Sequence, residues 1–251
     1  MKKFTQIILL FLIQFSWSQA DYSDSWEDFY SYNNVKDFIK VDNNIYAIVD
    51  NALFKYNLSN GNITKISSVN GLSGESTSSI FYSKTTEKIV IGYETGLLEI
   101  IDKKGNITIA KDIVNFNYSG NKQINDITEF DNKLYISTSF AVVVYNIDLL
   151  QFGDTYFIGN QSSEIKVNQI KIANNIIYAA TVNGIFTADV LDPNLIDYKR
   201  WTQNFTGDFI AIEVFDNEIF TSRARNLYTL NSNSLILQKT YSQNIRSIKA
   251  S

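Results

Sequence analysis

The side chains that perform most nucleophilic and acid–base catalysis are missing from this chain. Its 251 residues contain no histidine and no cysteine. Without imidazole or thiolate, the sequence excludes Ser-His-Asp and Cys-His nucleophiles, histidine general bases and the usual zinc sites. Carboxylates, tyrosines and arginines still permit polysaccharide cleavage, but no catalytic pair recurs at one place along the chain. The sequence therefore predicts no catalytic residue and a protein that is not an enzyme.

Three side chains stand out as candidate ligand contacts. Arg223 and Arg225 stand where comparable segments carry Thr138 or Thr181 and the turn that follows. Arginine forks bind anionic groups, and loop ends are common binding positions, so this pair is a candidate for an anionic glycan. Trp201 is a candidate stacking surface for a sugar ring. Most other aromatic residues alternate along predicted strands, where packing accounts for them.

Metal and cofactor sites are not indicated. The acidic lead-in of Asp21, Asp24, Glu27 and Asp28 lacks the glycine and spaced oxygen ligands of a calcium loop. The glycine-bearing stretch "NGLSGES" at 70–76 has no following lysine and does not match a phosphate-binding loop. We expect no metal and no cofactor.

The N-terminus has the pattern of an export signal. Lys2 and Lys3 precede an apolar run over 7–15, and Ser16 and Ser18 have the small-residue spacing of a cleavage site. The alternative is an uncleaved membrane anchor, which the nine-residue run disfavours because a bilayer core needs about 20 apolar residues. The sequence predicts a signal peptide over 1–18 and a mature chain without a transmembrane segment, exported to the periplasm or the outer-membrane cell surface.

Composition limits the partners and the source of stability. The chain has 22 basic and 26 acidic residues and no basic run, so nucleic acid is not an expected partner. An exported chain without cysteine has no disulfides, and its stability must come from burial and strand pairing. At 45% hydrophobic and 14% aromatic residues it can form a substantial core.

A repeat organises the chain after the N-terminus. An apolar residue that begins a second strand recurs at spacings of 44, 45, 43 and 42 residues, at Ile45, Ile89, Leu134, Ile177 and Ile219. An Asp-Asn or Asn-Asn pair precedes four of these strands and is typical of a tight hairpin turn, while "SKTTEK" at 83–88 predicts a longer loop in the second copy. Third strands are predicted at 52–57, 97–102, 142–147, 185–190 and 227–231, and the clearer fourth strands at 62–67 and 235–240.

Units of this size predict a β-propeller. Four short antiparallel strands in about 40 to 45 residues form one blade, and stacking buries the apolar blade faces. A parallel solenoid is the main alternative, but its coils are shorter and contain no hairpins. The fold class is therefore all-β, with one partial propeller domain over 19–251.

The two ends of the repeat do not form a closed ring. "WEDFYSY" at 26–32 resembles "KRWTQNF" at 199–205 and is predicted to be an outer strand without its own blade. "NIRSIKAS" at 244–251 is predicted to begin another inner strand. We therefore expect a chain truncated within a blade, with about five blades of roughly seven.

The repeats resemble a known family. "VNGLSGESTSSIFYS" at 69–83 and "IGYETGLLEI" at 91–100 resemble two-component-regulator propeller repeats. Together with "WEDFYSYNNVKDF" at 26–38 and "FGDTYFIG" at 152–159, the chain is similar to the N-terminal propeller of PorZ-type proteins of the Bacteroidetes type IX secretion system.

The resemblance implies a non-catalytic binding and scaffolding module. PorZ-type proteins have two propellers and a surface-targeting β-sandwich, and this chain stops within the first propeller. The implied partners are the proteins of a surface sortase and attachment complex, together with anionic lipopolysaccharide. Two alternatives remain open: a ligand-sensing ectodomain of a hybrid two-component receptor, and a propeller polysaccharide lyase.

Overall fold

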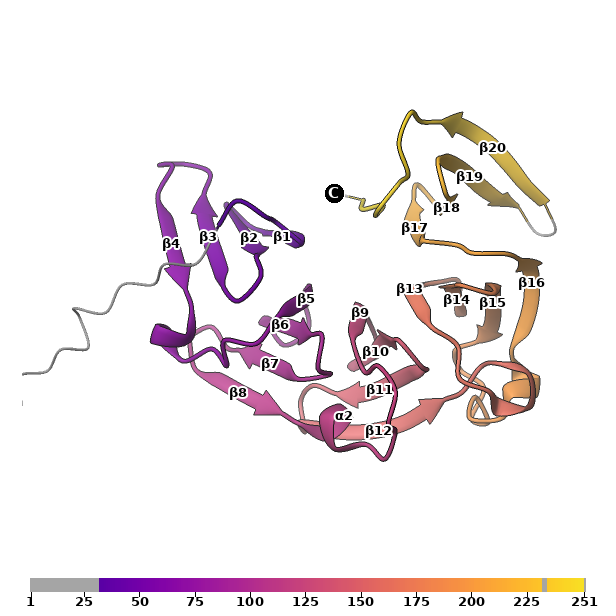
Figure 1. Ribbon diagram of the computed structural model, residues 1–251, viewed down its shortest axis with the longest axis horizontal. Helices are drawn as coiled ribbons and strands as arrows, with labels where there is room; N and C mark the ends of the chain where they lie inside the picture. The colour runs from indigo at the N-terminus through magenta and orange to yellow at the C-terminus, as the bar shows by residue number, and fades with distance from the viewer. Residues whose placement is uncertain (1–31, 232–233, 251) are drawn as a thin grey trace, which may run out of the picture.

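The strands of this protein form five blades arranged along an arc (Figure 1). The structure is a computed structural model that describes residues 32–231 and 234–250. In each four-stranded antiparallel sheet the strands lie in sequence order from the innermost to the outermost. The all-β propeller architecture predicted from the repeat is confirmed.

The blades are numbered in chain order. Blade 1 consists of β1 (Asp37–Val41), β2 (Asn44–Ile48), β3 (Leu53–Asn57) and β4 (Ile63–Ile66). Blade 2 consists of β5 (Thr77–Ser83), β6 (Lys88–Tyr93), β7 (Leu98–Ile101) and β8 (Ile107–Ala110). Blade 3 consists of β9 (Ile124–Phe130), β10 (Lys133–Thr138), β11 (Val142–Asn146) and β12 (Gln151–Tyr156). Blade 4 consists of β13 (Val167–Ala173), β14 (Ile176–Thr181), β15 (Gly184–Asp189) and β16 (Thr202–Thr206). Blade 5 consists of β17 (Ala211–Phe215), β18 (Glu218–Arg223), β19 (Asn226–Asn231) and β20 (Ser234–Thr240).

Short helical turns lie in the connections between strands. They are η2 (Ser68–Asn70), α2 (Asp112–Asn115), η3 (Asn160–Ser162) and η4 (Tyr198–Arg200). In the described part of the chain, each is far too short to cross a membrane.

The inner hairpins follow from turn chemistry. Both turn residues have positive φ angles, between 48° and 62°, at 131–132, 174–175 and 216–217. In the first blade only Asp42 does, with φ 52°. Asp and Asn tolerate this region because their short polar side chains bond locally, and the resulting turn matches the twist of a hairpin. Blade 2 has the longer loop expected there, which Thr86 closes by donating its N–H to Ser83 Oγ over 3.1 Å.

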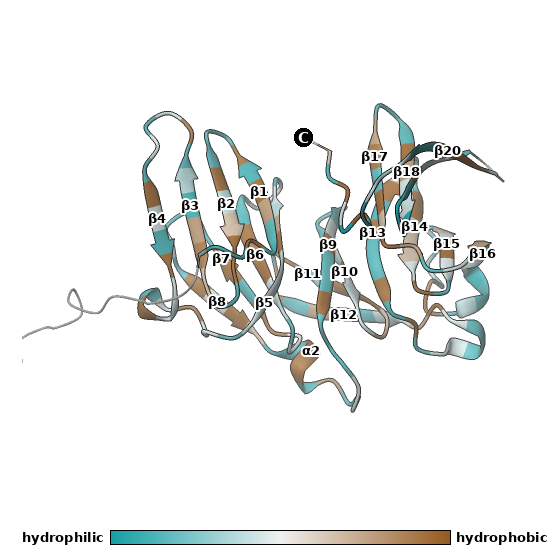
Figure 2. Cartoon of the chain, turned by 45° about the horizontal axis from the view of Figure 1, so that its top comes forward, coloured by the Kyte–Doolittle hydropathy of each residue, from teal (hydrophilic) through white to brown (hydrophobic). Residues whose placement is uncertain are grey.

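Alternation along the strands buries the faces between neighbouring blades. Figure 2 shows apolar and polar bands alternating along most strands. Side chains at successive strand positions point to opposite sheet faces, so each blade offers one face to the blade before it and one to the blade after it. At one inner-strand position facing the preceding blade, Ile80, Ile127, Ile170 and Ile212 are all at most 3% exposed.

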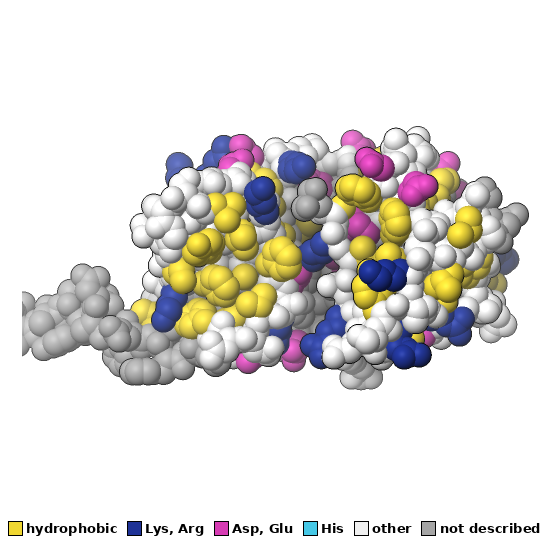
Figure 3. All heavy atoms as spheres, turned by 90° about the horizontal axis from the view of Figure 1, so that it is seen from above, with side chains coloured by type: hydrophobic (Ala, Val, Ile, Leu, Met, Phe, Trp, Pro, Cys, Tyr) yellow, Lys and Arg dark blue, Asp and Glu magenta, His cyan; other side chains and the backbone are white. Residues whose placement is uncertain are grey.

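The corresponding residue of blade 1 is different. Phe38 pairs with Ala47 as Ile170 pairs with Ala179, yet Phe38 is 50% exposed. The reason is that no blade of the described chain covers this face. Figure 3 looks onto the open side of the arc and shows hydrophobic side chains gathered over blade 1, with a smaller group over blade 5.

Residues 244–250 do not begin another inner strand, and that expectation was wrong for the described residues. A strand is held by hydrogen bonds to a neighbouring strand, and this segment has no second strand to pair with. Instead it runs between the ends of the arc: Ile245 donates its N–H to Ala224 O over 2.9 Å, and Lys249 forms an ion pair with Asp37. The predicted signal peptide and most of the predicted orphan outer strand at 26–32 lie outside the described residues.

Candidate functional site

The inner strands bring equivalent residues of all five blades to one axis. The apolar residue that marks the repeat in each second strand (the repeat mark) pairs with a residue of the inner strand. Three residues before that inner-strand partner, the five blades carry Asp37, Ser79, Asp126, Gln169 and Ala211. These five residues pair with second-strand residues in the same register. The blades therefore present one inner-strand level around a common centre, the place of the central channel in a propeller.

A small polar pocket lies at this level. We call it the axial pocket; its volume is about 190 Å³. It is lined by Lys36, Asp37, Ser78, Asn125, Asp126, Asn168, Gln169, Ile210, Ala211, Arg246, Ser247 and Lys249. Because its walls come from all five blades and from the C-terminal segment, its shape depends on the arrangement of the whole arc.

Amide side chains around the pocket connect each blade to the next. Asn125 donates its Nδ2–H to Val167 O over 2.8 Å, and Asn168 repeats the contact one blade later with Phe209 O over 2.7 Å. Gln169 Oε1 accepts the N–H of Ile212 over 2.9 Å. These bonds satisfy backbone groups at the inner edge of each blade, and they fix the blades relative to one another.

The charged groups near the axis are mostly paired across blade interfaces. Lys171 lies 3.5 Å from Glu213 of the next blade. Burial lowers the pKa of Lys171, but the carboxylates of Asp126 and Glu213 outweigh it and hold that pKa above its usual value. Lys249 pairs with Asp37 and also donates to Phe38 O over 3.0 Å.

Asp126 lacks such a partner. Its Oδ2 is buried and accepts no hydrogen bond from the described residues. Burial raises the pKa of Asp126 to about 6, although Lys171 and Lys249 pull it down. The ionised form is therefore disfavoured by the folded state, with the largest effect at neutral pH.

Asp126→Asn is expected to make the protein more stable at pH 8 by about 1 to 2 kcal/mol. The folded-state pKa is above the ordinary value of 3.8, so in the unsubstituted chain stability falls as pH rises from about 4 to about 6 and then levels off. The variant should lose this dependence. Urea denaturation between pH 4 and 8 measures it, with the exposed Asp42→Asn as control; a variant less stable at pH 8 would contradict the assignment.

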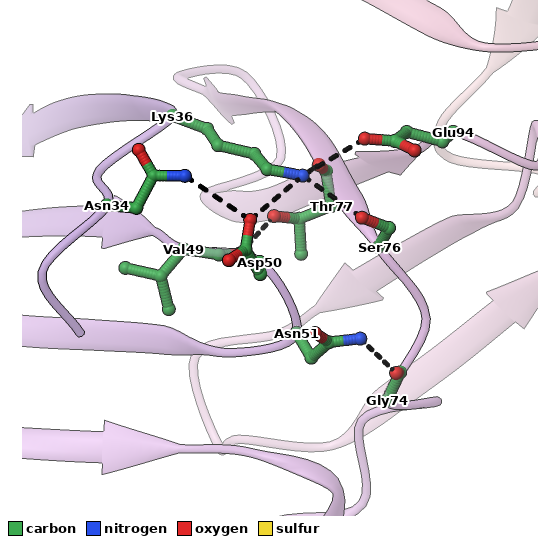
Figure 4. Close-up of polar contacts among 9 residues, drawn as sticks. All are labelled: Asn34, Lys36, Val49, Asp50, Asn51, Gly74, Ser76, Thr77 and Glu94. Carbon is green, nitrogen blue, oxygen red and sulfur yellow. Dashed lines mark hydrogen bonds and ion pairs between the residues drawn. The ribbon is translucent and has the colours of Figure 1, made fainter. Parts of the chain in front are cut away.

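Lys36 forms a second polar cluster, at the junction of blades 1 and 2 (Figure 4). Its Nζ lies 3.0 Å from Glu94 and 3.4 Å from Asp50. It also donates to Ser76 Oγ over 3.0 Å and to Thr77 O over 2.9 Å. One partly buried ammonium thus links the start of β1, the turn after β2, the start of β5 and the turn after β6.

Lys36→Met is expected to destabilise the chain by about 1 to 2 kcal/mol, because charged hydrogen bonds across a blade junction are lost. The same substitution at the exposed Lys40 in β1 should change stability by less than about 0.5 kcal/mol. Chemical denaturation of the two variants compares them directly. Equal losses would show that the Lys36 contacts contribute nothing specific.

A buried carboxyl group supports the loop beside this cluster. Glu99 in β7 is fully buried; its Oε1 accepts the N–H of Ser73 over 2.6 Å, and its Oε2 accepts the hydroxyl of Tyr93. Burial, reinforced by Glu99, raises the pKa of Tyr93 far above its usual value, so the tyrosine is a hydrogen-bond donor. This contact anchors the loop between β4 and β5 to blade 2. Asn51 holds the same loop by donating to Gly74 O over 2.6 Å.

Arg223 and Arg225 lie at the exposed turn between β18 and β19. At the matching place in blades 3 and 4, Thr138 and Thr181 close the turn by donating to Ala141 O and Gly184 O, each over 2.8 Å. The side chain of Arg223 forms no such hydrogen bond to a residue that the structure describes. Arg225 O accepts the N–H of Tyr241, the residue after β20, over 2.8 Å, and in blade 4 Asn183 O accepts the N–H of Gly207 after β16 in the same way.

Trp201 lies away from the arginines, just before the outer strand β16. It is 6% exposed, and its indole Nε1–H donates to Leu195 O over 3.0 Å. Its ring packs 6.2 Å from that of Tyr156. It contributes to a groove of about 420 Å³ on the rim between blades 3 and 4, with walls that include Tyr198, Lys199 and Gln203. The structure therefore brings Arg223 and Arg225 together but places Trp201 in a separate groove.

Sequence reasoning missed Lys36 and Asp126. Lys36 directly precedes β1 and Asp126 lies within β9, and neither belongs to the apolar pattern that predicts these strands. They could have been found by aligning the inner strands of the five blades. Three or four residues before the inner-strand partner of the repeat mark, blades 1 and 3 carry a charged residue, whereas blades 2, 4 and 5 carry Ser, Asn, Gln or apolar residues. Among residues 32–231 and 234–250, no group of three or more acidic side chains is arranged to hold a metal ion.

Comparisons with known proteins agree with the propeller fold. The family model described as "TSS9, PorZ, N-terminal beta-propeller domain" matches residues 45–202. A search of curated proteins found no match. The solved structure of PorZ from Porphyromonas gingivalis, described as an essential bacterial surface component of the type IX secretion system, matches with a TM-score of 0.74 and 20% identity over 87% of this chain.

Other solved structures are similar in fold. The extracellular domain of the hybrid two-component system protein BT4673 from B. thetaiotaomicron matches with a TM-score of 0.68 and 15% identity over 89% of this chain. U3-55K matches with a TM-score of 0.61 and 10% identity over 83%. The chain spans 30% of the PorZ chain and 32% of the BT4673 chain. Because the family model covers more than half of its residues, the chain belongs to the PorZ N-terminal β-propeller family.

Proposed function

We propose that this protein is an exported, non-catalytic binding and scaffolding module of type IX secretion, acting at the cell surface in cargo attachment. Membership of the PorZ N-terminal propeller family is the observation that carries the proposal. The absence of histidine and cysteine supports a role in binding rather than catalysis. In this role the blades supply rigidity, and the loops and turns at one end supply contacts.

We further propose that the five blades, within a domain over 19–251, are part of a larger closed propeller. The half-exposed Phe38 on blade 1 and Ile236 on blade 5, 48% exposed, lie on faces that neighbouring blades cover elsewhere. Covering these faces would bury apolar surface and remove the open side of the arc.

Disruption of the gene in its host tests the scaffold role. Proteins secreted by the type IX route should accumulate in the periplasm, and expression of the complete gene should return them to the surface. Cell fractionation followed by mass spectrometry measures both. Normal surface delivery in the disrupted strain would contradict the proposal.

The proposed glycan ligand is anionic lipopolysaccharide, with Arg223 and Arg225 as contacts and Trp201 as a weaker candidate. The two exposed arginines at one turn support this ligand class, because guanidinium groups bind phosphate and carboxylate. Replacing both with glutamine should lower binding to immobilised lipopolysaccharide by about tenfold, whereas Arg200→Gln should not. Unchanged binding by the double variant would exclude this turn as the contact.

A second candidate function is ligand sensing by the ectodomain of a hybrid two-component receptor. The likeness to the BT4673 extracellular domain favours it, although at 15% identity this is a likeness of fold. The two functions differ in what the gene encodes downstream. A transmembrane helix and a kinase would support sensing, and a further propeller with a β-sandwich would support the secretion role.

A further inference from the structure

The axial pocket contains acceptors that lack donors. Asp126 Oδ2 and Ser78 Oγ are both buried, and neither has a hydrogen-bond partner among the described residues. A buried polar atom without a partner costs about 1 to 3 kcal/mol, and more when it carries charge. An incoming donor that reaches both oxygens would remove this cost.

The basic side chains already near Asp126 have other partners. Lys36 is bound by Asp50 and Glu94, while Lys249 pairs with Asp37. Lys171, which does not line the pocket, pairs with Glu213. No ion pair to Asp126 is formed by the part of the chain that the structure describes, so the site favours a donor that is also a cation.

The same pocket contains an unpaired cation. Arg246 lines it, is exposed, and forms no hydrogen bond or ion pair with the residues that the structure describes. A guanidinium group binds a carboxylate through two parallel hydrogen bonds. Asp126 and Arg246 both line the pocket, whose volume of about 190 Å³ has room for only a small molecule.

We propose that the axial pocket binds a small zwitterion of the α-amino acid class, with the ammonium group on Asp126 and Ser78 and the carboxylate on Arg246. This inference does not depend on the secretion role. It rests on a buried carboxylate oxygen without a partner and an exposed guanidinium without an ion pair that line one pocket, and on the pairing of the other charges around them. The ligand binds without any bond being made or broken.

Nitrogen-15 NMR of the 251-residue chain tests the proposal with four probes. Glycine and L-alanine carry both charges, methylamine carries only the cation, and acetate carries only the anion. The zwitterions should give saturable shifts at Asn125, Asp126 and Asn168, with at least tenfold tighter binding than methylamine or acetate. Asp126→Asn and Arg246→Gln should each weaken glycine binding at least tenfold.

Matched controls separate binding from folding. Asp42→Asn and Arg200→Gln remove the same charges at exposed positions outside the pocket and should leave glycine binding unchanged. Denaturation of Asp126→Asn at the pH of the titration verifies that this variant is folded. Absence of saturable shifts with glycine, equal affinity in Asp126→Asn, or methylamine binding as tightly as glycine would each overturn the proposal.

Discussion

Replacing Ile170 with alanine is expected to lower the free energy of unfolding by about 3 kcal/mol. Ile170 is fully buried in the core cluster between blades 3 and 4, and truncation leaves a cavity lined by apolar side chains. Replacing Phe38 with alanine removes a larger side chain from the equivalent position of blade 1. Because Phe38 is 50% exposed, the expected loss is about 1 kcal/mol or less.

Urea denaturation of the two variants checks whether the smaller truncation, Ile170→Ala, lowers the free energy of unfolding more than the larger one, Phe38→Ala. Lys249 Nζ lies 5.6 Å from the centre of the Phe38 ring, and losing this contact accounts for the small decrease in stability expected for Phe38→Ala. Ile212→Ala, at the same position in blade 5, should behave like Ile170→Ala because Ile212 is fully buried. A loss for Phe38→Ala as large as that for Ile170→Ala would mean that blade 1 is covered on both faces.

Replacing Glu99 with alanine is expected to cost about 3 kcal/mol, because a buried hydrogen-bonded group is removed and its partners are left unsatisfied. The hydroxyl of the buried Tyr93 and the N–H of Ser73 both lose their acceptor. Glu99→Gln retains one oxygen and should lose less. The loop over 70–76 should also exchange its amide protons faster in Glu99→Ala.

Thermal unfolding and hydrogen exchange measure the two effects separately. The exposed Glu218→Ala is the matched control and should change stability by less than about 0.5 kcal/mol. If Glu99→Ala is as stable as the control, the carboxyl group does not anchor the loop. If stability falls without faster exchange at 70–76, the anchor acts on blade 2 alone.

The second strands and inner hairpins were predictable from sequence because their signals are local. The repeat marks at Ile45, Ile89, Leu134, Ile177 and Ile219 all fall within the second strands. The turn pairs are determined by φ angles that few residue types tolerate. Burial on both faces also gives these central strands a clear apolar pattern.

The outer strands were harder to predict because their local pattern is weak, and the axial site because its residues are far apart in the sequence. Half of the residues of β12 are exposed, and its sequence "QFGDTY" shows little of the apolar alternation that marks a strand. Asp126 and Lys36 belong to a site assembled from residues about 40 or more positions apart. Their proximity exists only once the blades are arranged around an axis, and no local pattern encodes it. Burial of Trp201 likewise depends on contacts between blades 3 and 4.

The arrangement of five blades on an arc around one axis is the central claim, and distances between spin labels at the inner hairpins test it most directly. Because the chain has no native cysteine, a pair of introduced cysteines can be labelled specifically. One replaces Asn43, and the other replaces Thr85, Lys133, Ala173 or Glu218 in turn. Distances from Asn43 should increase towards blades 2, 3 and 4, and the distance to blade 5 should not exceed that to blade 4. A distance that grows steadily through blade 5 would indicate a linear stack of sheets and contradict the account.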